Sequence, residues 1–182
     1  MAVNFNGIKL NNTTFNGIDL AKVLFDGVVV FLKALLYENG KKIVEWATNI
    51  YTSSGYSSGN ASVSFEANQI VMFSKCDSNN GDCSIYTQDK INFEKYSKLC
   101  AEIYTSSGGA TSSIDFGIIS TLPTSLKKPV FQRVIGLQNY NTITKVEINV
   151  SDINDSYNVG FWNWNCHSGT TSTLVIKKVW LE

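Results

Sequence analysis

The first segment of the chain repeats one short phrase every ten residues. The copies are Phe5-Asn6-Gly7-Ile8, Phe15-Asn16-Gly17-Ile18 and Phe25-Asp26-Gly27-Val28. Asn-Gly and Asp-Gly pairs favour two-residue type I′ turns, because both central residues of such a turn need a positive φ angle. A tight turn at this spacing leaves about eight residues for each strand. The repeat therefore predicts an antiparallel β-meander over residues 1–36, with a hairpin turn at each Asn-Gly or Asp-Gly pair.

A sheet of this size buries little surface and is marginally stable alone, so it packs either on the rest of the chain or on a partner. Residues before Val28 are only mildly apolar, and five apolar residues then follow at 28–32. An exposed strand edge of this composition favours pairing with another chain. We therefore interpret residues 1–36 as an attachment segment.

Residues 37–182 alternate short runs of valine, isoleucine, threonine and aromatic residues with clusters of serine, glycine and asparagine. No convincing amphipathic helix is present, and residues 93–97 predict at most one helical turn. This many strands over about 140 residues favours a jelly-roll β-sandwich over an immunoglobulin sandwich. Strands are predicted near residues 43–51, 62–66, 69–75, 83–87, 98–106, 112–120, 130–138, 143–150, 157–166 and 172–181.

Charge and hydropathy exclude several classes of function. The 182 residues contain 15 lysines and arginines against 15 aspartates and glutamates, and no basic run exceeds two residues. Because electrostatic binding of nucleic acid needs clustered cations, we expect no nucleic-acid partner. The apolar stretch at 20–37 is interrupted by charges and a turn, so we expect no membrane insertion. The first residues lack basic and apolar regions, so we expect no secretory signal.

The four cysteines lack the paired spacing of a structural zinc site, which predicts no bound metal. Cys76 and Cys83 flank a turn-forming stretch at 77–82 and could face each other across a hairpin. They would form a disulfide in an oxidising environment and remain thiols in a reducing cytosol. The second alternative treats them as two small, half-buried side chains.

The residues of the repeat, from Asn4 to Phe31, resemble the N-terminal segment of tail-associated proteins from phages and prophages of Gram-positive gut bacteria. Those proteins continue into a sandwich that resembles a carbohydrate-binding module. The stretches at 89–99, 159–162 and 174–181 are similar to short sequence motifs of such modules. The resemblance implies a place in the virion tail, synthesis in the host cytoplasm, other tail proteins and a cell-surface glycan as partners, and a homo-oligomer, by analogy with tail fibres a trimer.

A search for catalytic groups predicts a protein that is not an enzyme and needs no cofactor. The only histidine, His167, lies in a turn and is interpreted as solvated. The densest acidic group, Glu147, Asp152 and Asp155, lies at a strand end and in the following turn, which favours a solvated loop over a facing pair of catalytic carboxylates. The stretch from Asp77 to Asp82 offers oxygen ligands, but its glycine comes one place early for a calcium loop.

Sugar binding needs aromatic faces and nearby hydrogen-bonding groups. Trp162 and Trp164 share one face of a predicted strand, and Phe161, Asn163 and Asn165 share the other. We favour burial of the tryptophans, because tryptophan is usually buried and asparagine is polar. In the alternative, they face outward as a stacking platform. Better candidates for exposed, sugar-binding aromatics are Trp46, Tyr56 and Tyr140, because loops present side chains to solvent and carry binding residues disproportionately.

These observations together predict a non-enzymatic, tail-associated protein whose sandwich binds host-surface glycans. One alternative is a purely structural tail protein, which has kept the fold without a ligand. The other is a polysaccharide-degrading enzyme, which would need a cleft with two facing carboxylates.

Overall fold

The computed structural model describes residues 3–5, 8–10, 14–15, 18–19, 22–25, 28–51, 61–76, 81–107, 112–124, 127–165 and 169–182. Side chains are described from Lys33 onward, with the exception of Ser107 and Ser112.

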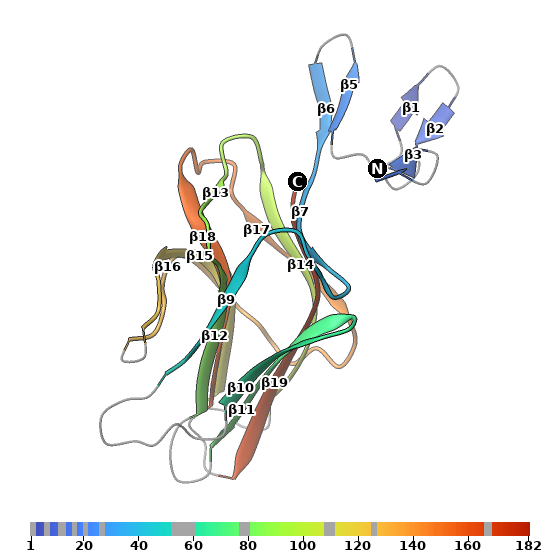
Figure 1. Ribbon diagram of the computed structural model, residues 1–182. Helices are drawn as coiled ribbons and strands as arrows, with labels where there is room; N and C mark the ends of the chain where they lie inside the picture. Colours follow the sequence, from blue (N-terminus) through green and yellow to red (C-terminus); the bar gives the residue numbers. More distant parts are fainter. Residues whose placement is uncertain are drawn as a thin grey trace.

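Two antiparallel sheets pack face to face in a jelly-roll β-sandwich, which confirms the predicted fold class (Figure 1). We name each sheet after its central strand. The β19 sheet has the order β10-β11-β19-β14-β17, and β7 pairs with the C-terminal part of β19 and with β8. Its strands are β7 (Ala34–Glu38), β8 (Lys41–Lys42), β10 (Ala61–Glu66), β11 (Gln69–Cys76), β14 (Lys98–Ser107), β17 (Thr144–Asn149) and β19 (Thr170–Leu181).

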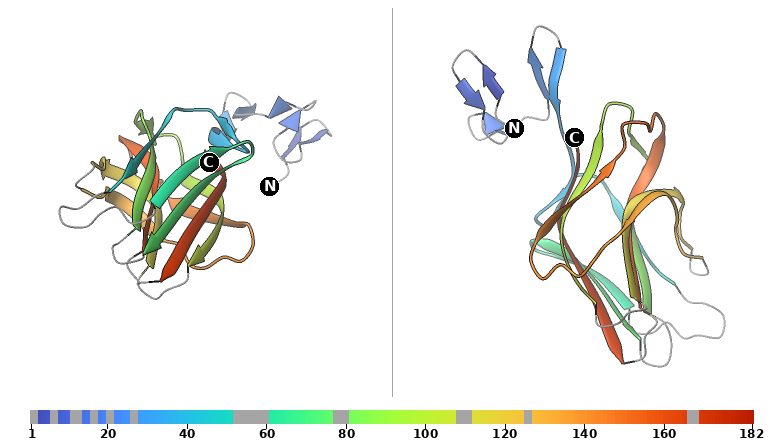
Figure 2. Two further views of the ribbon diagram at one scale, coloured as in Figure 1. Left: turned by 60° about the horizontal axis from the view of Figure 1, so that its bottom comes forward. Right: turned by 180° about the vertical axis from the view of Figure 1, so that it is seen from behind.

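The β18 sheet has the order β16-β15-β18-β12-β9, and the short β13 also pairs with β18. Figure 2 shows the two layers from behind. Both long neighbours of β18 run antiparallel to it, so β18 lies in the middle of its sheet. The strands are β9 (Trp46–Ile50), β12 (Gly81–Thr87), β13 (Ile91–Asn92), β15 (Ser112–Thr121), β16 (Val130–Gly136) and β18 (Ser156–Asn165).

The N-terminal repeat forms hairpins, as predicted, but not one meander. Phe5 pairs with Ile8, and Phe25 pairs with Val28, so two residues separate the strands of each hairpin. The turn residues themselves lie outside the described part of the chain. The two strands that flank each Asn-Gly or Asp-Gly pair bond to each other, which gives three separate two-stranded sheets. Their strands are β1 (Val3–Phe5), β2 (Ile8–Leu10), β3 (Thr14–Phe15), β4 (Ile18–Asp19), β5 (Lys22–Phe25) and β6 (Val28–Leu32).

These hairpins lie beyond the end of the sandwich where β7 and the C-terminus are found (Figures 1 and 2). β6 leads through Lys33 into β7. Because β7 begins at Ala34 and pairs with β19, the sandwich also takes in residues 34–36, which the sequence assigned to the first segment.

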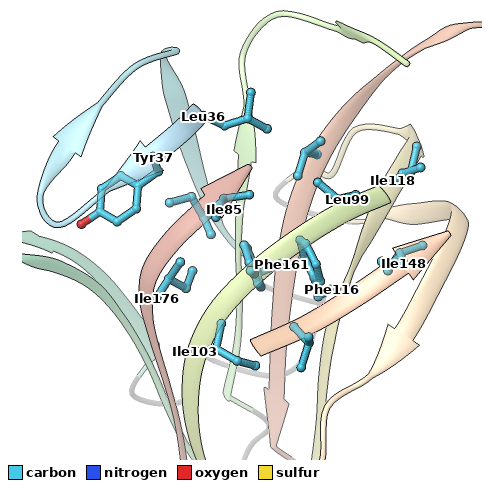
Figure 3. Close-up of a cluster of buried hydrophobic side chains, with 14 of the residues drawn as sticks. Leu36, Tyr37, Ile85, Leu99, Ile103, Phe116, Ile118, Ile148, Phe161 and Ile176 are labelled. Atoms are coloured by element: carbon cyan, nitrogen blue, oxygen red, sulfur yellow. The ribbon is translucent and has the colours of Figure 1, made fainter. Parts of the chain in front are cut away.

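The core consists of aliphatic and aromatic side chains from the inner faces of both sheets (Figure 3). Phe116 of β15 and Phe161 of β18 are fully buried and stack with ring centroids 4.5 Å apart. Leu99, Ile103 and Ile176 of the facing sheet are also fully buried. Burial of this apolar area is the main favourable term for the sandwich.

The ten predicted strands of residues 37–182 all occur, each within a few residues of the predicted limits. Alternating apolar positions, such as those of β11, account for this agreement, because their period of two matches the pleat. The sequence missed β7, β8 and β13. The predicted helical turn at 93–97 is a hydrogen-bonded turn in which the Tyr96 amide donates to the Phe93 carbonyl. Within the described part of the chain, no helix has the length and apolar character needed to cross a membrane.

The disulfide alternative for Cys76 and Cys83 is wrong for this structure, which holds the two as separate buried thiols. The Cys83 sulfur lies 3.6 Å from the Phe73 carbonyl and 3.7 Å from that of Ser62. Burial raises the pKa of Cys83 far above its ordinary range, so this thiol remains protonated.

We expect Phe161→Ala to lower the free energy of unfolding by about 3–5 kcal/mol, because it leaves a cavity beside Phe116. Urea unfolding followed by tryptophan fluorescence measures the change. Phe65→Ala, at a position on β10 that is 40% exposed, is the matched control and should cost about 1 kcal/mol or less. Equal losses in the two variants would contradict this placement of the core.

Candidate functional site

The outer face of the β18 sheet carries the two tryptophans. Phe161 belongs to the core cluster, so the alternation of β18 places Trp162 and Trp164 on the opposite face. The favoured prediction, with the tryptophans facing the core and the asparagines outside, is wrong in orientation, although Trp162 is buried. The Asn163 amide donates to the carbonyls of Met72 and Ser172, at 3.2 Å each. Because both acceptors belong to the facing sheet, the amide nitrogen of the buried asparagine is satisfied by backbone that the sequence pattern does not show, whereas its Oδ1 is buried without a hydrogen-bond partner among the described residues.

The two tryptophan rings lie against each other. Their centroids are 6.0 Å apart and their planes differ by 20°. The Trp162 side chain is 9% exposed, whereas Trp164 is half-buried. The Trp162 indole Nε1 donates a short hydrogen bond to the Asp82 carboxylate. Trp164 thus offers aromatic surface to solvent, while Trp162 is held in place by its hydrogen bond to Asp82 on the neighbouring strand.

Carboxylates and hydroxyls flank the pair on both neighbouring strands. On β12, Asp82 lies opposite Trp164 and Ser84 lies opposite Trp162. On β15, Ser113 and Asp115 occupy the equivalent positions in the opposite order. The Ser113 hydroxyl donates to the Asp115 carboxylate at 3.0 Å. Each side of the tryptophan pair therefore carries one hydroxyl and one carboxylate.

Burial changes the acidity of both carboxylates. Burial raises the pKa of Asp82 to about 6, and the Trp162 hydrogen bond and the Lys128 charge only partly oppose this effect. Burial also raises the pKa of Asp115, against the Ser113 hydrogen bond and the same lysine. Perturbed carboxyl groups beside an outward-facing aromatic pair are typical of functional sites.

The connection from β15 to β16 covers part of this face, and we call its described residues, 122–124 and 127–129, the strap. The Asn49 amide of β9, at the far edge of the sheet, donates to the Thr124 carbonyl at 3.0 Å. Pro123 and Pro129 are buried. The Lys128 ammonium nitrogen lies 4.9 Å from the centre of the Trp162 ring. The strap therefore covers Trp162.

The other aromatic candidates do not join this group. Trp46 is 4% exposed, belongs to the core and donates its indole hydrogen to the Leu36 carbonyl at 3.3 Å, so its prediction as an exposed aromatic is wrong. Tyr140 is half-buried and packs against the core, and its backbone bonds to Thr105 of β14, in the other sheet. Tyr56 and His167 lie outside the described residues.

In the acidic group singled out from the sequence, Glu147 and Asp152 form ion pairs and Asp155 accepts a backbone hydrogen bond. Asp152 binds Arg133 through two short hydrogen bonds of 2.6 and 2.7 Å. Glu147 pairs with Lys98 and Lys145, and Asp155 accepts from the Ser156 amide. The first part of the proposed calcium stretch, residues 77–80, lies outside the described residues, and Asp82 belongs to β12.

Away from the tryptophans, a hollow of about 370 Å³ lies at the β19 sheet and is lined by Ser97, Lys98, Glu147, Asn149 and Ser151. Next to it, ligand atoms of Cys100, Glu147 and Glu182 lie within 4.8 Å of one another. Burial raises the pKa of Cys100 to about 12, so the thiol is protonated at neutral pH. Because two lysines already neutralise Glu147, this cluster is a poor metal site.

Sequence reasoning missed Asp115, Asn49 and Lys128, and it considered Asp82 only as a calcium ligand. A signal existed for the carboxylates, since Asp82 precedes a β12 pattern with Cys83 and Ile85 inside, and Asp115 lies between Ile114 and Phe116. Alternation alone places both on the outer face. Lys128 and Asn49 reach the site only through the strap, which has no local sequence signal.

The arrangement suits binding better than hydrolysis. An aromatic surface, hydroxyls and carboxylates can hold the apolar face and the hydroxyl groups of a sugar. Hydrolysis would need two carboxylates opposed across a glycosidic bond. Asp82 is 5% exposed and is already bonded to the Trp162 indole, so it is poorly placed to reach that bond.

No family model and no curated protein matches the sequence. Solved structures share its fold. The Emp47p carbohydrate recognition domain aligns with a TM-score of 0.52 and 14% identity, over 81% of this chain and 93% of that one. A family 11 carbohydrate-binding module from Clostridium thermocellum, in complex with a β-1,3-1,4-mixed-linked tetrasaccharide, aligns with a TM-score of 0.50 and 9% identity, over 82% and 94%. At these identities the likeness concerns the fold alone: this chain has a jelly-roll sandwich of the kind found in carbohydrate-binding modules.

Asp82 should make stability depend on pH. Its pKa is raised from an ordinary 3.8 to about 6 in the folded protein, so the folded state holds this proton more tightly than the unfolded state. Its contribution is fully present below about pH 4 and is lost as the pH rises through about 6. We expect Asp82→Asn to be more stable than the wild type at neutral pH, by at most about 2–3 kcal/mol.

Urea unfolding of both proteins at about pH 4 and pH 7.5 tests this prediction. The advantage of Asp82→Asn should appear only at the higher pH. Asn154→Ala, at an exposed position without a titratable group, is the control and should show no such difference. The same advantage at both pH values would contradict the assigned titration.

Proposed function

We propose that this protein binds a glycan on the outer face of the β18 sheet, at the margin of the strap. The observation that carries the proposal is the stacked pair of Trp162 and Trp164, directed away from the core and flanked by a hydroxyl and a carboxylate on each side. The C–H face of a pyranose packs well on an indole ring, and its hydroxyl groups need donors and acceptors beside that ring.

Trp164 is the main contact in this proposal, because it is the more exposed of the two rings. Ser113 and Asp115 are close enough in the register to bond the same sugar. One such site would bind weakly. Many copies on one particle would compensate, because linked sites make the second contact effectively intramolecular.

The finer proposal is that the protein is a non-enzymatic component of a phage or prophage tail. The resemblance of the N-terminal repeat to tail-associated proteins supports it. The three two-stranded sheets at 3–32 also support it, because such small sheets are marginal without a partner surface. Under this proposal they attach the sandwich to other tail proteins, in a homo-oligomer that we expect to be a trimer.

We expect Trp164→Ala to weaken glycan binding at least about tenfold, the size of one lost stacking contact of ~1.4 kcal/mol. The purified chain, immobilised at high density, would be screened against a glycan array and whole bacterial cells. Tyr104→Ala, a half-buried position on the outer face of the other sheet, is the matched control and should bind as the wild type does.

The same screen separates the alternatives. Failure of the wild type to bind any glycan or cell would contradict the proposal and favour a purely structural tail protein. Release of reducing ends from a bound polysaccharide would favour a degrading enzyme. Equal loss in both variants would place the site elsewhere.

Antibodies against residues 37–182 should label the tail in electron micrographs of virions from the phage or prophage that encodes the chain. Unlabelled virions in a lysate that contains the protein would contradict the tail role and leave the glycan proposal standing. Sedimentation equilibrium of the full chain should give the mass of three copies, and a monomer would contradict the trimer.

A further inference from the structure

The group that covers Trp162 is itself a cation. The Lys128 ammonium lies 4.9 Å from the centre of the Trp162 ring, inside the range of a cation–π interaction. The same ammonium interacts electrostatically with Asp82 and Asp115, one on each side of β18. An aromatic face and two acidic side chains thus converge on one positive charge.

This combination is the chemistry by which proteins recognise ammonium groups, with an aromatic face for the cation and carboxylates for its charge. Lys128 supplies that cation from within the chain. Its side chain is exposed, so its ammonium can leave the ring for water at little cost. The contact is therefore exchangeable, whereas the hydrogen bond between Trp162 and Asp82 is buried.

We propose that the glycan bound at this site carries a free, positively charged amine, which takes the place of the Lys128 ammonium over Trp162. This inference rests on the proposed function and specifies its ligand class: an amine-bearing glycan, such as a polymer of amino sugars without N-acetyl groups. A sugar ring attached to the amine would extend toward Trp164.

Charge favours such a ligand over the other classes. With both carboxylates ionised, Asp82, Asp115 and Lys128 together carry a net charge of −1, and −2 remains when the lysine swings away. A neutral sugar would leave both carboxylates without their cation, and a uronic acid or phosphate would add a third negative charge. An amine restores the pairing that Lys128 provided.

The experiment compares one oligosaccharide in two forms, with free primary amines and with the same amines acetylated. Acetylation removes the charge and keeps the backbone. Binding to the full chain is measured by tryptophan fluorescence at about pH 6.5, which is above the pKa of Asp82 and low enough for the amines of an amino-sugar oligomer to carry protons. We expect the amine form to bind at least tenfold more tightly and to lose this advantage as salt is added.

Two variants sharpen the test. Lys128→Met keeps the length of the side chain and removes the competing charge, so it should bind the amine form severalfold more tightly than the wild type does. Lys127→Met, the exposed neighbour in the strap, is the matched control and should change nothing. Asp115→Asn should weaken binding of the amine form by a larger factor than binding of the acetylated form, with circular dichroism as the check on folding.

The outcomes separate this inference from the proposed function. Equal binding of the two forms, lost in Trp164→Ala, would overturn the amine ligand and leave glycan binding intact. Tighter binding of a uronic-acid oligosaccharide would also overturn it. Failure of every glycan and every cell surface to bind would overturn both proposals.

Discussion

The alternation of β18 is the constraint on which the rest of the sandwich depends. Side chains of a strand point alternately to opposite faces, so one residue of slippage would exchange the core and the surface. β18 is paired on both sides over most of its length, which extends its alternation to β12 and β15. Asn163 strengthens this register, because its amide bonds two carbonyls of the facing sheet and fits only from the inner face. The same register that stacks Phe161 on Phe116 therefore presents the tryptophan pair outside.

Stability and recognition compete at the outer face. Ionised Asp82 destabilises the folded chain at neutral pH, since burial raises its pKa, yet it is the group that bonds the Trp162 indole. A neutral residue there would give a more stable fold and a weaker electrostatic field around the ring. Under the proposed function, this cost is the usual one for a binding site that holds charged groups partly out of water.

The sequence predicted the structure correctly where the local pattern of residues determines it. The prediction failed where contacts with distant backbone determine which way a side chain points. Runs of alternating apolar residues located the long strands because their period matches the pleat. The orientation of residues 161–165 was predicted wrongly because tryptophan and asparagine were judged by their average burial. Asn163 is buried here because the carbonyls of Met72 and Ser172, on the other sheet, accept hydrogen bonds from its amide nitrogen. Lys128 was missed for the same reason, since its position depends on a strap anchored at Asn49.

Assembly of several chains would benefit both the N-terminal repeat and the sandwich. Each N-terminal hairpin has strands of only two to five residues, too short to be stable as an isolated sheet. Such hairpins gain stability by packing on another surface, which favours assembly of several chains. Under the proposed function the sandwich also requires assembly of several copies, because a site built around one half-buried tryptophan binds a single sugar weakly. Assembly through the hairpins would hold several β18 faces together, and this linkage would turn weak contacts into firm adhesion.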